Sequence, residues 1–364
     1  MTKREKLLKL YRREGMDEVP VSMHLCPSLE EEFERRYPGE TDYLDHFGAP
    51  YRIIYDPGFP WNFDAKWRIP DRDNIDWMKY YSEDEFQREK KFDLWGTAHE
   101  KGSKAAVHMT QMHHPLKNAN SLDELQNYPW PDFSTVDFSY LDAEVKAIHA
   151  KGLAVFVWAE CTIWETAWYV RGMDNLMMDI ALEDEKATWL LDTITDKACQ
   201  RARAFAKAGV DILGLGDDVG MQQALMMSQK MYQGWLKPRL AKVIAAAREV
   251  NPDIMISYHS CGYVTPLIGD FIDAGVDILN PVQPECMNFK DVFEQYGGRI
   301  SFNGTIGTQQ LMPNGSPQDV CDEVKRNLEI AGDKGGLFCC PTHMLEPEVP
   351  WDNIEAYVDA CRNF

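Results

Sequence analysis

The chain has 364 residues, of which 45% are hydrophobic and 12% aromatic, enough apolar material for one large core. Its 58 acidic and 38 basic residues give a net charge of −20, so its surface repels nucleic acid and anionic lipid. No run approaches the roughly 18 consecutive apolar residues of a membrane helix. We therefore expect neither nucleic acid nor a membrane as a partner.

Cysteine usage and the first residues indicate the compartment. The nine cysteines are odd in number and lack the spacing of a disulfide framework. Residues 1–10 are charged and contain no apolar stretch typical of a signal peptide. The sequence therefore predicts a cytoplasmic protein with reduced thiols, some of them free to bind a metal ion.

Short apolar runs that end in polar residues or glycine predict β-strands along the chain. Two such runs lie in the irregular N-terminal part, and the others follow after residue 150 at regular intervals. In chain order, the expected strands are residues 19–23, 51–55, 153–158, 211–215, 254–258, 277–279, 299–302 and 336–339.

Amphipathic stretches separate the later strands. Residues 186–208, 238–250 and 317–331 carry apolar side chains at helical spacing. The pentapeptide Ala-Gly-Val-Asp-Ile occurs at 208–212 and again at 274–278, which is typical of a helix that ends at glycine before a new strand. This alternation predicts an α/β fold, and eight strands favour a (β/α)8 (TIM) barrel. A doubly wound sheet is the alternative, but no G-x-G-x-x-G follows the first strand.

Residues from about 57 to 140 are rich in Pro, Trp, Asp and Tyr, and we interpret them as an N-terminal insertion of loops and a hairpin. Residues 104–112 are expected to add a strand there. Two neighbouring histidines, His113 and His114, cannot share one face of a strand, so a structural or surface role is expected for them. No linker interrupts the chain, and residues 1–364 are expected to form a single domain.

Active sites of barrels of this kind lie at the C-terminal ends of the strands. Polar residues gather at these ends in the sequence, although strand ends that meet solvent can be polar without any function. The residues expected at this edge are His24, Asp56, Trp158, Glu160, Asp217, Asp218, His259, Cys261, Asn280, Asn303, Cys339, Cys340 and His343.

The sharpest motif in this set is an H-x-C pair, His259 and Cys261. Residues two apart at the end of a strand point the same way, so imidazole and thiolate can converge on one zinc ion. Zinc needs at least a third protein ligand, for which Cys339, Cys340 and His343 are the candidates. The plainer interpretation of each is a small buried thiol or a hydrogen-bonded core imidazole.

Three carboxylates are candidates for proton transfer or ligand binding. Asp217 and Asp218 are adjacent, so one is expected to face the pocket and the other to cap a turn. We assign general acid/base catalysis to Asp217 and substrate binding to Asp218. Glu160 lies in a Trp-rich segment, where burial would raise its pKa and suit it to donate a proton.

Aromatic and polar side chains near the strand ends are expected to bind the substrate. Trp158 and Trp164 are close together in the sequence and favour an aromatic pocket. Tyr258, Asn280 and His24 complete the expected substrate-binding set.

Several segments together form a pattern known from one superfamily. They are WETA at 164–167, VRGM at 170–173, GDDVG at 216–220, HSCG at 259–262, GVDILNPVQ at 275–283, GG at 335–336, PTH at 341–343 and PWDNI at 350–354. With them the chain resembles the uroporphyrinogen decarboxylase superfamily over nearly its whole length. The resemblance implies a barrel of the (β/α)8 type.

The superfamily contains two chemistries. True uroporphyrinogen decarboxylases use no metal and carry an Arg-Gln-Ala-Gly-Arg-Tyr segment after the first strand, but residues 23–28 read MHLCPS and lack these arginines. The other branch moves methyl groups to or from a corrinoid, and includes methylcobamide:coenzyme M methyltransferases and the methyltransferases of O-demethylase systems. The resemblance therefore implies the methyltransferase branch.

Members of that branch bind zinc through an H-x-C pair and a later cysteine. Here the pair falls on His259 and Cys261, and the later cysteine falls on His343 when residues 335–336 and 347–350 are held in register. The resemblance thus favours His343 as the third ligand, with Cys339 or Cys340 as alternatives.

The resemblance implies a zinc-dependent methyltransferase that acts between a small methylated substrate and a corrinoid. No D-x-H-x-x-G motif occurs, so the cobalamin is expected on a separate carrier protein. The tryptophans favour an aryl methyl ether as the substrate. The alternatives are a metal-free decarboxylase or lyase acting on a smaller acid, and a non-catalytic barrel that binds a corrinoid or another ligand. A homodimer is left open.

Overall fold

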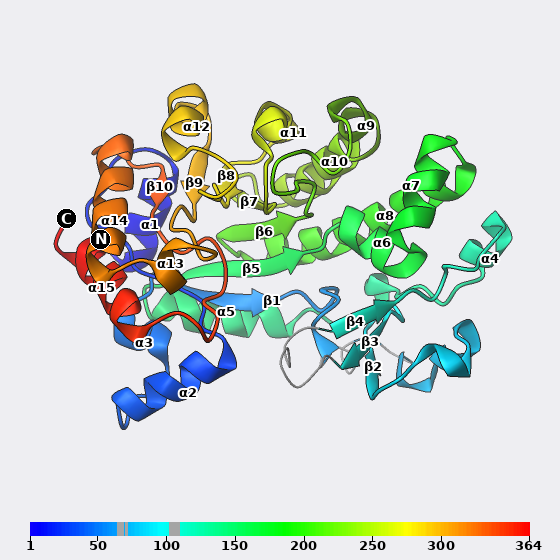
Figure 1. The fold of residues 1–364 in the computed structure, drawn as a ribbon. Coiled ribbons are helices and arrows are strands. Elements are labelled where there is room, and N and C mark those ends of the chain that lie inside the picture. Colours follow the sequence, from blue (N-terminus) through cyan, green and yellow to red (C-terminus); the bar gives the residue numbers. More distant parts are fainter. Residues whose placement is uncertain (64–68, 70–71, 102–109) are drawn as a thin grey trace.

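A parallel sheet of seven strands forms the centre of the computed structural model, which describes residues 1–364 except 64–68, 70–71 and 102–109. The sheet curls, and its strands follow the order β1-β5-β6-β7-β8-β9-β10 (Figure 1). The strands are β1 Tyr51–Tyr55, β5 Ala154–Glu160, β6 Ile212–Gly216, β7 Met255–His259, β8 Ile278–Asn280, β9 Ser301–Asn303 and β10 Leu337–Phe338.

The register of the sheet places the site residues at one level. Glu160 pairs with Gly216, Gly216 pairs with His259, and His259 pairs with Asn280. Because the strands are parallel, these four residues end neighbouring strands at the same edge. The C-terminal edge that the sequence assigned to the site is therefore a continuous row of residues.

The eighth strand expected at residues 19–23 is the part of the fold prediction that was wrong, because this segment does not join the sheet ladder. Pro20 has no N–H to donate, which disfavours a ladder position. The segment still fills the space beside β1: Ser22 Oγ lies 3.1 Å from Tyr51 Oη, and the Tyr357 hydroxyl donates to the Ser22 carbonyl at 3.1 Å. A single bridge between Leu25 and Leu345 follows it.

Helices after β5 cover the outer side of the sheet (Figure 1). The three helices expected from amphipathic spacing are confirmed as α8 (Glu185–Ala208), α10 (Lys237–Arg248) and α14 (Pro317–Ala331). Gly209 and Gly275 follow helices at φ +83° and +108°, which confirms the repeated helix–glycine–strand pattern. The helices around the sheet are α5 Tyr140–Ala150, α8 Glu185–Ala208, α10 Lys237–Arg248, α11 Ile268–Ala274, α12 Phe289–Tyr296, α14 Pro317–Ala331 and α15 Trp351–Arg362.

Shorter helices fill the termini and the loops. The N-terminal and loop α-helices are α1 Lys3–Tyr11, α2 Pro27–Arg36, α3 Tyr43–Phe47, α4 Leu122–Gln126, α6 Trp164–Arg171, α7 Met173–Ala181, α9 Gln229–Trp235 and α13 Leu311–Asn314. Short 3-10 helices occupy Arg72–Asn74, Trp77–Tyr80, Glu83–Glu85, Phe133–Thr135 and Thr265–Leu267. In the part of the chain that the structure describes, no helix is long and apolar enough to cross a membrane.

The insertion contains an antiparallel sheet of three strands, β2 Lys90–Phe92, β3 Ala98–Lys101 and β4 Thr110–His113. It lies beyond the end of β1 (Figure 1). Of the strand expected at 104–112, the last three residues belong to β4, and residues 104–109 lie outside the described residues.

Candidate functional site

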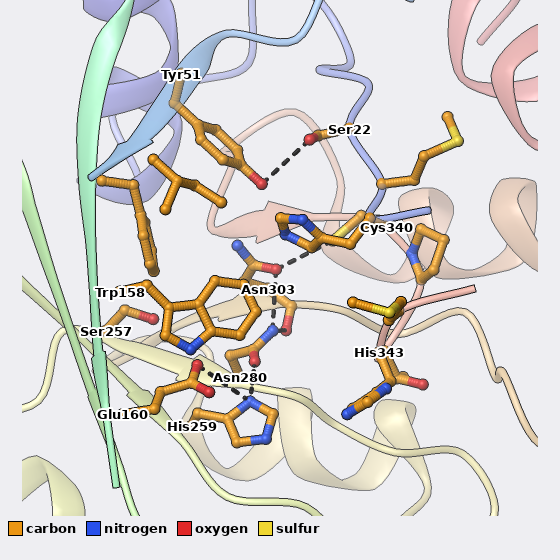
Figure 2. Close-up of a pocket in the computed structure, with 17 residues that line it drawn as sticks. Ser22, Tyr51, Trp158, Glu160, Ser257, His259, Asn280, Asn303, Cys340 and His343 are labelled. Carbon is orange, nitrogen blue, oxygen red and sulfur yellow. Dashed lines mark hydrogen bonds and ion pairs between the residues drawn. The ribbon is translucent and has the colours of Figure 1, made fainter. Parts of the chain in front are cut away.

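A cavity of about 130 Å³ lies at the C-terminal edge of the sheet (Figure 2). Strands β1, β5, β7, β8 and β9 contribute to its wall, together with the segments before α2 and after β10. Its lining residues are Ser22, Met23, His24, Tyr51, Ile53, Phe156, Trp158, Glu160, Ser257, His259, Asn280, Asn303, Cys340, Pro341, Thr342, His343 and Met344.

Alternation along the strands decides which expected residues reach the cavity. On β5 the side chains of Trp158 and Glu160 line it, and on β7 that of His259 does. Tyr258 points the other way and packs against Phe271, with ring centroids 4.8 Å apart. Tyr258 therefore lies outside the cavity that the sequence expected it to line.

Three potential metal ligands converge beside this cavity. The Sγ atom of Cys261 lies 3.3 Å from Nε2 of His259, and Oδ1 of Asp218 lies 3.8 Å from the same nitrogen. The ligand atoms of the three residues all lie within 4.8 Å of one another. The Cys261 backbone N–H donates to Asp218 Oδ1 at 2.7 Å, which fixes the carboxylate. We call Asp218, His259 and Cys261 the ligand triad.

The chemistry of the triad fits a zinc ion, because imidazole nitrogen, thiolate sulfur and carboxylate oxygen are its usual protein ligands. The electrostatics of the site fit as well. Burial works to lower the pKa of His259, but Glu160, Cys261 and Asp218 outweigh it and raise this pKa well above its ordinary value. The groups around the imidazole therefore stabilise a positive charge, which either a proton or a bound cation on Nε2 would supply.

A chain of hydrogen bonds orients His259. Its Nδ1 lies 2.6 Å from Asn280 Oδ1, while Asn280 Nδ2 donates to the carbonyl and the side-chain oxygen of Asn303 at 2.9 and 3.1 Å. Asn303 Nδ2 donates to the Tyr11 hydroxyl at 2.7 Å. Because the amide oxygen of Asn280 faces His259, Nδ1 carries the proton, and the lone pair of Nε2 is directed to the triad.

The other expected metal ligands lie outside the triad. The Cys340 thiol donates to Asn303 Oδ1 at 3.0 Å, and burial raises its pKa well above the ordinary value. Cys339 is buried against Thr305, with 3.6 Å between its sulfur and Oγ1. His343 lines the same cavity as His259 (Figure 2), so its role as a ligand stays a prediction.

Glu160 is the carboxylate that faces the cavity. Its Oε1 lies 3.6 Å from His259 Nδ1, and Figure 2 shows both groups beside the Trp158 ring. Burial raises the pKa of Glu160 to about 7; the nearby His259 opposes this shift and Asp218 reinforces it. Glu160 can therefore hold a proton near neutral pH.

Asp217 has a different position from the one expected. Its carboxylate accepts the backbone N–H groups of Ile163 and Glu165 at 3.1 and 2.9 Å, which caps the start of α6. Burial raises its pKa to about 7, against the lowering effect of these bonds. Trp164 is fully buried in α6. Neither Asp217 nor Trp164 lines the cavity, so of the two adjacent aspartates it is Asp218 that belongs to the site.

Aromatic rings surround the remaining space of the cavity. His24 meets Trp158 edge to face at 5.2 Å, and Tyr55 stacks on Trp158 from the rim at 6.2 Å. Burial lowers the pKa of His24 to about 4, so its ring is neutral at pH 7. Sequence reasoning missed Tyr51, at the start of β1, and Phe156, in the middle of β5. The period-two alternation of both strands was the signal that could have found them.

A second, more open groove of about 740 Å³ adjoins the cavity on the other side of the triad. It shares Thr342, His343 and Met344 with the cavity. Cys261 lines the groove and not the cavity, whereas His259 lines the cavity and not the groove. The ligand triad therefore lies between an enclosed cavity and an open groove.

Other polar residues singled out in the sequence are engaged elsewhere. His113 Nε2 lies 3.0 Å from a Glu100 oxygen, and His114 Nδ1 lies 2.8 Å from the Tyr169 carbonyl oxygen. Asp56 forms a buried ion pair with Arg201 at 2.7 Å. These contacts tie parts of the structure together, in line with a structural role for the two histidines.

The sequence profile of uroporphyrinogen decarboxylase (URO-D) matches residues 94–364. The chain belongs to this family. A solved methyltransferase from Methanosarcina mazei shares the fold, with a TM-score of 0.65 and 21% identity over 100% of this chain and 99% of that one.

Two curated relatives are also similar to this URO-D family member. A methylated-thiol–coenzyme M methyltransferase of Methanosarcina mazei is 27% identical over 204 residues, 54% of this chain and 50% of the relative. The methylcobamide:CoM methyltransferase MtaA of Methanosarcina barkeri is 26% identical over 170 residues, 47% of each chain. The chain thus spans about half the length of the curated relatives it matches.

Proposed function

We propose that the protein is a zinc-dependent methyltransferase that moves a methyl group between a small methylated substrate and a corrinoid carried by another protein. The observation that carries this proposal is the ligand triad of Asp218, His259 and Cys261 beside an enclosed cavity. Two relatives named as methyltransferases of methylated thiols or methylcobamide support it.

The triad would hold the zinc ion, and His343, which lines the same cavity as His259, is a further ligand candidate. When bound, zinc supplies a Lewis acid at the substrate heteroatom, and the corrinoid supplies a cobalt nucleophile or methyl donor. Within the chain, Asn280 keeps the Nε2 lone pair of His259 directed to the triad. The Cys261 backbone N–H keeps Asp218 in place.

An aryl methyl ether is our proposed methyl donor, since Trp158, Phe156 and Tyr51 give the cavity aromatic walls. Glu160 would hold a proton on its carboxyl group and pass it to the ether oxygen as the carbon–oxygen bond breaks. The methyl group leaves for the corrinoid, and the product is a neutral phenol. The open groove on the Cys261 side gives the carrier protein an approach to the triad.

Zinc analysis and a methyl-transfer assay test this function together. We expect about one zinc per chain, lost in a His259→Ala/Cys261→Ala variant, and transfer of methyl from methoxyarenes to a reduced corrinoid protein. Absence of zinc after incubation with the metal under reducing conditions would rule out the site. Carbon dioxide release without cobalamin would instead support a metal-free decarboxylase.

A further inference from the structure

The charge of the enclosed cavity restricts what it can bind. Among the lining residues that the structure describes, none is lysine or arginine, and the only carboxylate is Glu160. The nearby arginines of the sequence are engaged elsewhere: Arg52 forms an ion pair with Asp45, and Arg13 donates to Ser301 Oγ at 2.9 Å. An anionic substrate would therefore meet an acidic group and no lysine or arginine side chain to pair with it.

The ligand triad does not supply a surplus of positive charge. A dication held by the carboxylate of Asp218 and the thiolate of Cys261 has no net charge, and Glu160 adds a further acidic group 3.6 Å from His259. Burying the anionic group of a substrate beside these residues costs free energy, because no basic side chain pairs with it.

Both side-chain amides of the cavity already donate hydrogen bonds within the protein. Asn280 Nδ2 donates to Asn303, and Asn303 Nδ2 donates to the Tyr11 hydroxyl. At the end of the cavity away from His259, the Tyr51 and Ser22 hydroxyls lie 3.1 Å apart (Figure 2). These hydroxyls can offer hydrogen bonds to a phenol or an amide, and they carry no charge to offset a carboxylate.

We propose that the cavity takes an uncharged methyl donor and excludes donors that carry a carboxylate or sulfonate. This inference rests on the proposed function, of which it names the substrate class. Both the methylated substrate and the demethylated phenol are then neutral, so neither binding nor release places an unpaired anion beside Glu160.

Calorimetry with a matched pair of ligands tests the proposal. The ligands are 4-hydroxy-3-methoxybenzamide and 4-hydroxy-3-methoxybenzoate, which have nearly the same shape and differ in charge. We expect the amide to bind the zinc-loaded chain at least tenfold more tightly than the carboxylate. Equal or tighter binding of the carboxylate, or failure of both to bind, would overturn the proposal.

Two variants locate the source of the discrimination. Glu160→Gln removes the ionised form of this carboxyl group and is expected to reduce the amide-to-carboxylate ratio at least threefold. Met344→Lys adds a cation on the cavity rim, at a side chain 39% exposed, and is expected to tighten carboxylate binding. The same change at Met178, 59% exposed on α7, is the matched control and should leave the ratio as it is. An unchanged ratio in both cavity variants would contradict the electrostatic argument.

Methyl transfer, measured separately, distinguishes this inference from the function on which it rests. Selective binding of the amide without transfer to any corrinoid protein would refute the methyltransferase and leave the charge selection standing. Efficient transfer from the benzoate would refute the charge selection and leave the methyltransferase standing.

Discussion

The Nδ1 atom of His259 lies 2.6 Å from the side-chain oxygen of Asn280, and the two residues are register partners at the ends of adjacent strands. The pairing of β7 with β8 thus determines which nitrogen of the imidazole faces the ligand triad. Backbone register and ligand orientation are consequences of the same strand alignment.

Replacing Asn280 with Leu is expected to lower zinc affinity by about 10- to 100-fold, because it removes the group that orients His259. Competition with a chromogenic chelator measures this change. Asn363→Ala, at an exposed amide near the C-terminus, is the control and should bind zinc like the wild type. Wild-type affinity in the Asn280 variant would contradict the orienting role.

The adjacent aspartates are expected to behave differently. Asp218→Ala should weaken zinc binding and leave folding nearly unchanged, since its carboxylate belongs to the triad. Asp217→Ala should leave the zinc ligands in place and lower the free energy of unfolding by about 1–2 kcal/mol, since it removes the cap of α6. Zinc titration and urea unfolding on both variants check this, and the reverse outcome would exchange the two roles.

Gly216 gives His259 the space it needs. A Cβ atom at Gly216 would lie 2.7 Å from the His259 carbonyl oxygen and 2.8 Å from its Cβ. Gly216→Ala is therefore expected to lower the free energy of unfolding by about 1–3 kcal/mol and to weaken zinc binding. Gly269→Ala, where nothing lies within 4 Å of the added carbon, should be neutral or stabilising.

Glu160→Gln is expected to reduce methyl transfer by about 10²- to 10⁴-fold, the usual effect of losing a general acid. Zinc content should stay at the wild-type level, because Glu160 is not part of the triad. Single-turnover transfer to the corrinoid protein measures the loss. An unaffected rate with an aryl ether would show that the proton comes from another group.

The ionisation of Asp270 is expected to make the stability of the fold depend on pH in the acid range. Burial works to raise its pKa, but hydrogen bonds from Gln229, Lys237 and Gln233 outweigh burial, so the pKa lies below its ordinary value. A carboxyl group with a lowered folded-state pKa stabilises the protein above its unfolded pKa of about 3.9, and this stabilisation is lost as the pH falls through the folded value.

Asp270→Asn should therefore be less stable than the wild type by about 1–3 kcal/mol at pH 7, with the difference shrinking below about pH 4. Urea unfolding at several pH values checks this. Asp273 pairs with the same lysine, Lys237, but its side chain is 58% exposed. Asp273→Asn is therefore expected to lower the free energy of unfolding by less than about 1 kcal/mol. A pH-independent difference at Asp270 would contradict the assignment.

Much of the sheet could be predicted from the sequence because its strands are short apolar runs bounded by polar residues. Register was not predictable, since it depends on pairing between strands distant in the chain. The segment at 19–23 has a strand-like composition, but Pro20 and the hydroxyls of Tyr51 and Tyr357 hold it in place without a ladder. Composition alone does not reveal such side-chain anchoring.

The positions of candidate residues were predictable where alternation along a strand decided them, as at Glu160 and His259, and Cys261 follows two residues after the end of β7. Which of Asp217 and Asp218 belongs to the site could not be predicted. It depends on where α6 begins, because Asp217 caps that helix. Tyr258 shows the same limit: it lies one residue before His259 and therefore faces the helices. Cys340 lines the cavity, but its thiol donates a hydrogen bond to Asn303 Oδ1.

The segment at residues 19–23, which takes the place of the expected eighth strand, is expected to affect local opening of the sheet. Between β10 and β1, side-chain hydroxyls and a single bridge take the place of a backbone ladder. Ser22 and His24 belong to this segment and also line the cavity. Weakly laddered backbone opens at a lower free energy than central strands, so amide hydrogens of residues 21–24 should exchange with deuterium sooner than those of β5 to β7. The curled sheet would then open along its cavity wall, which would give substrates a side entrance separate from the groove that we propose for the carrier protein.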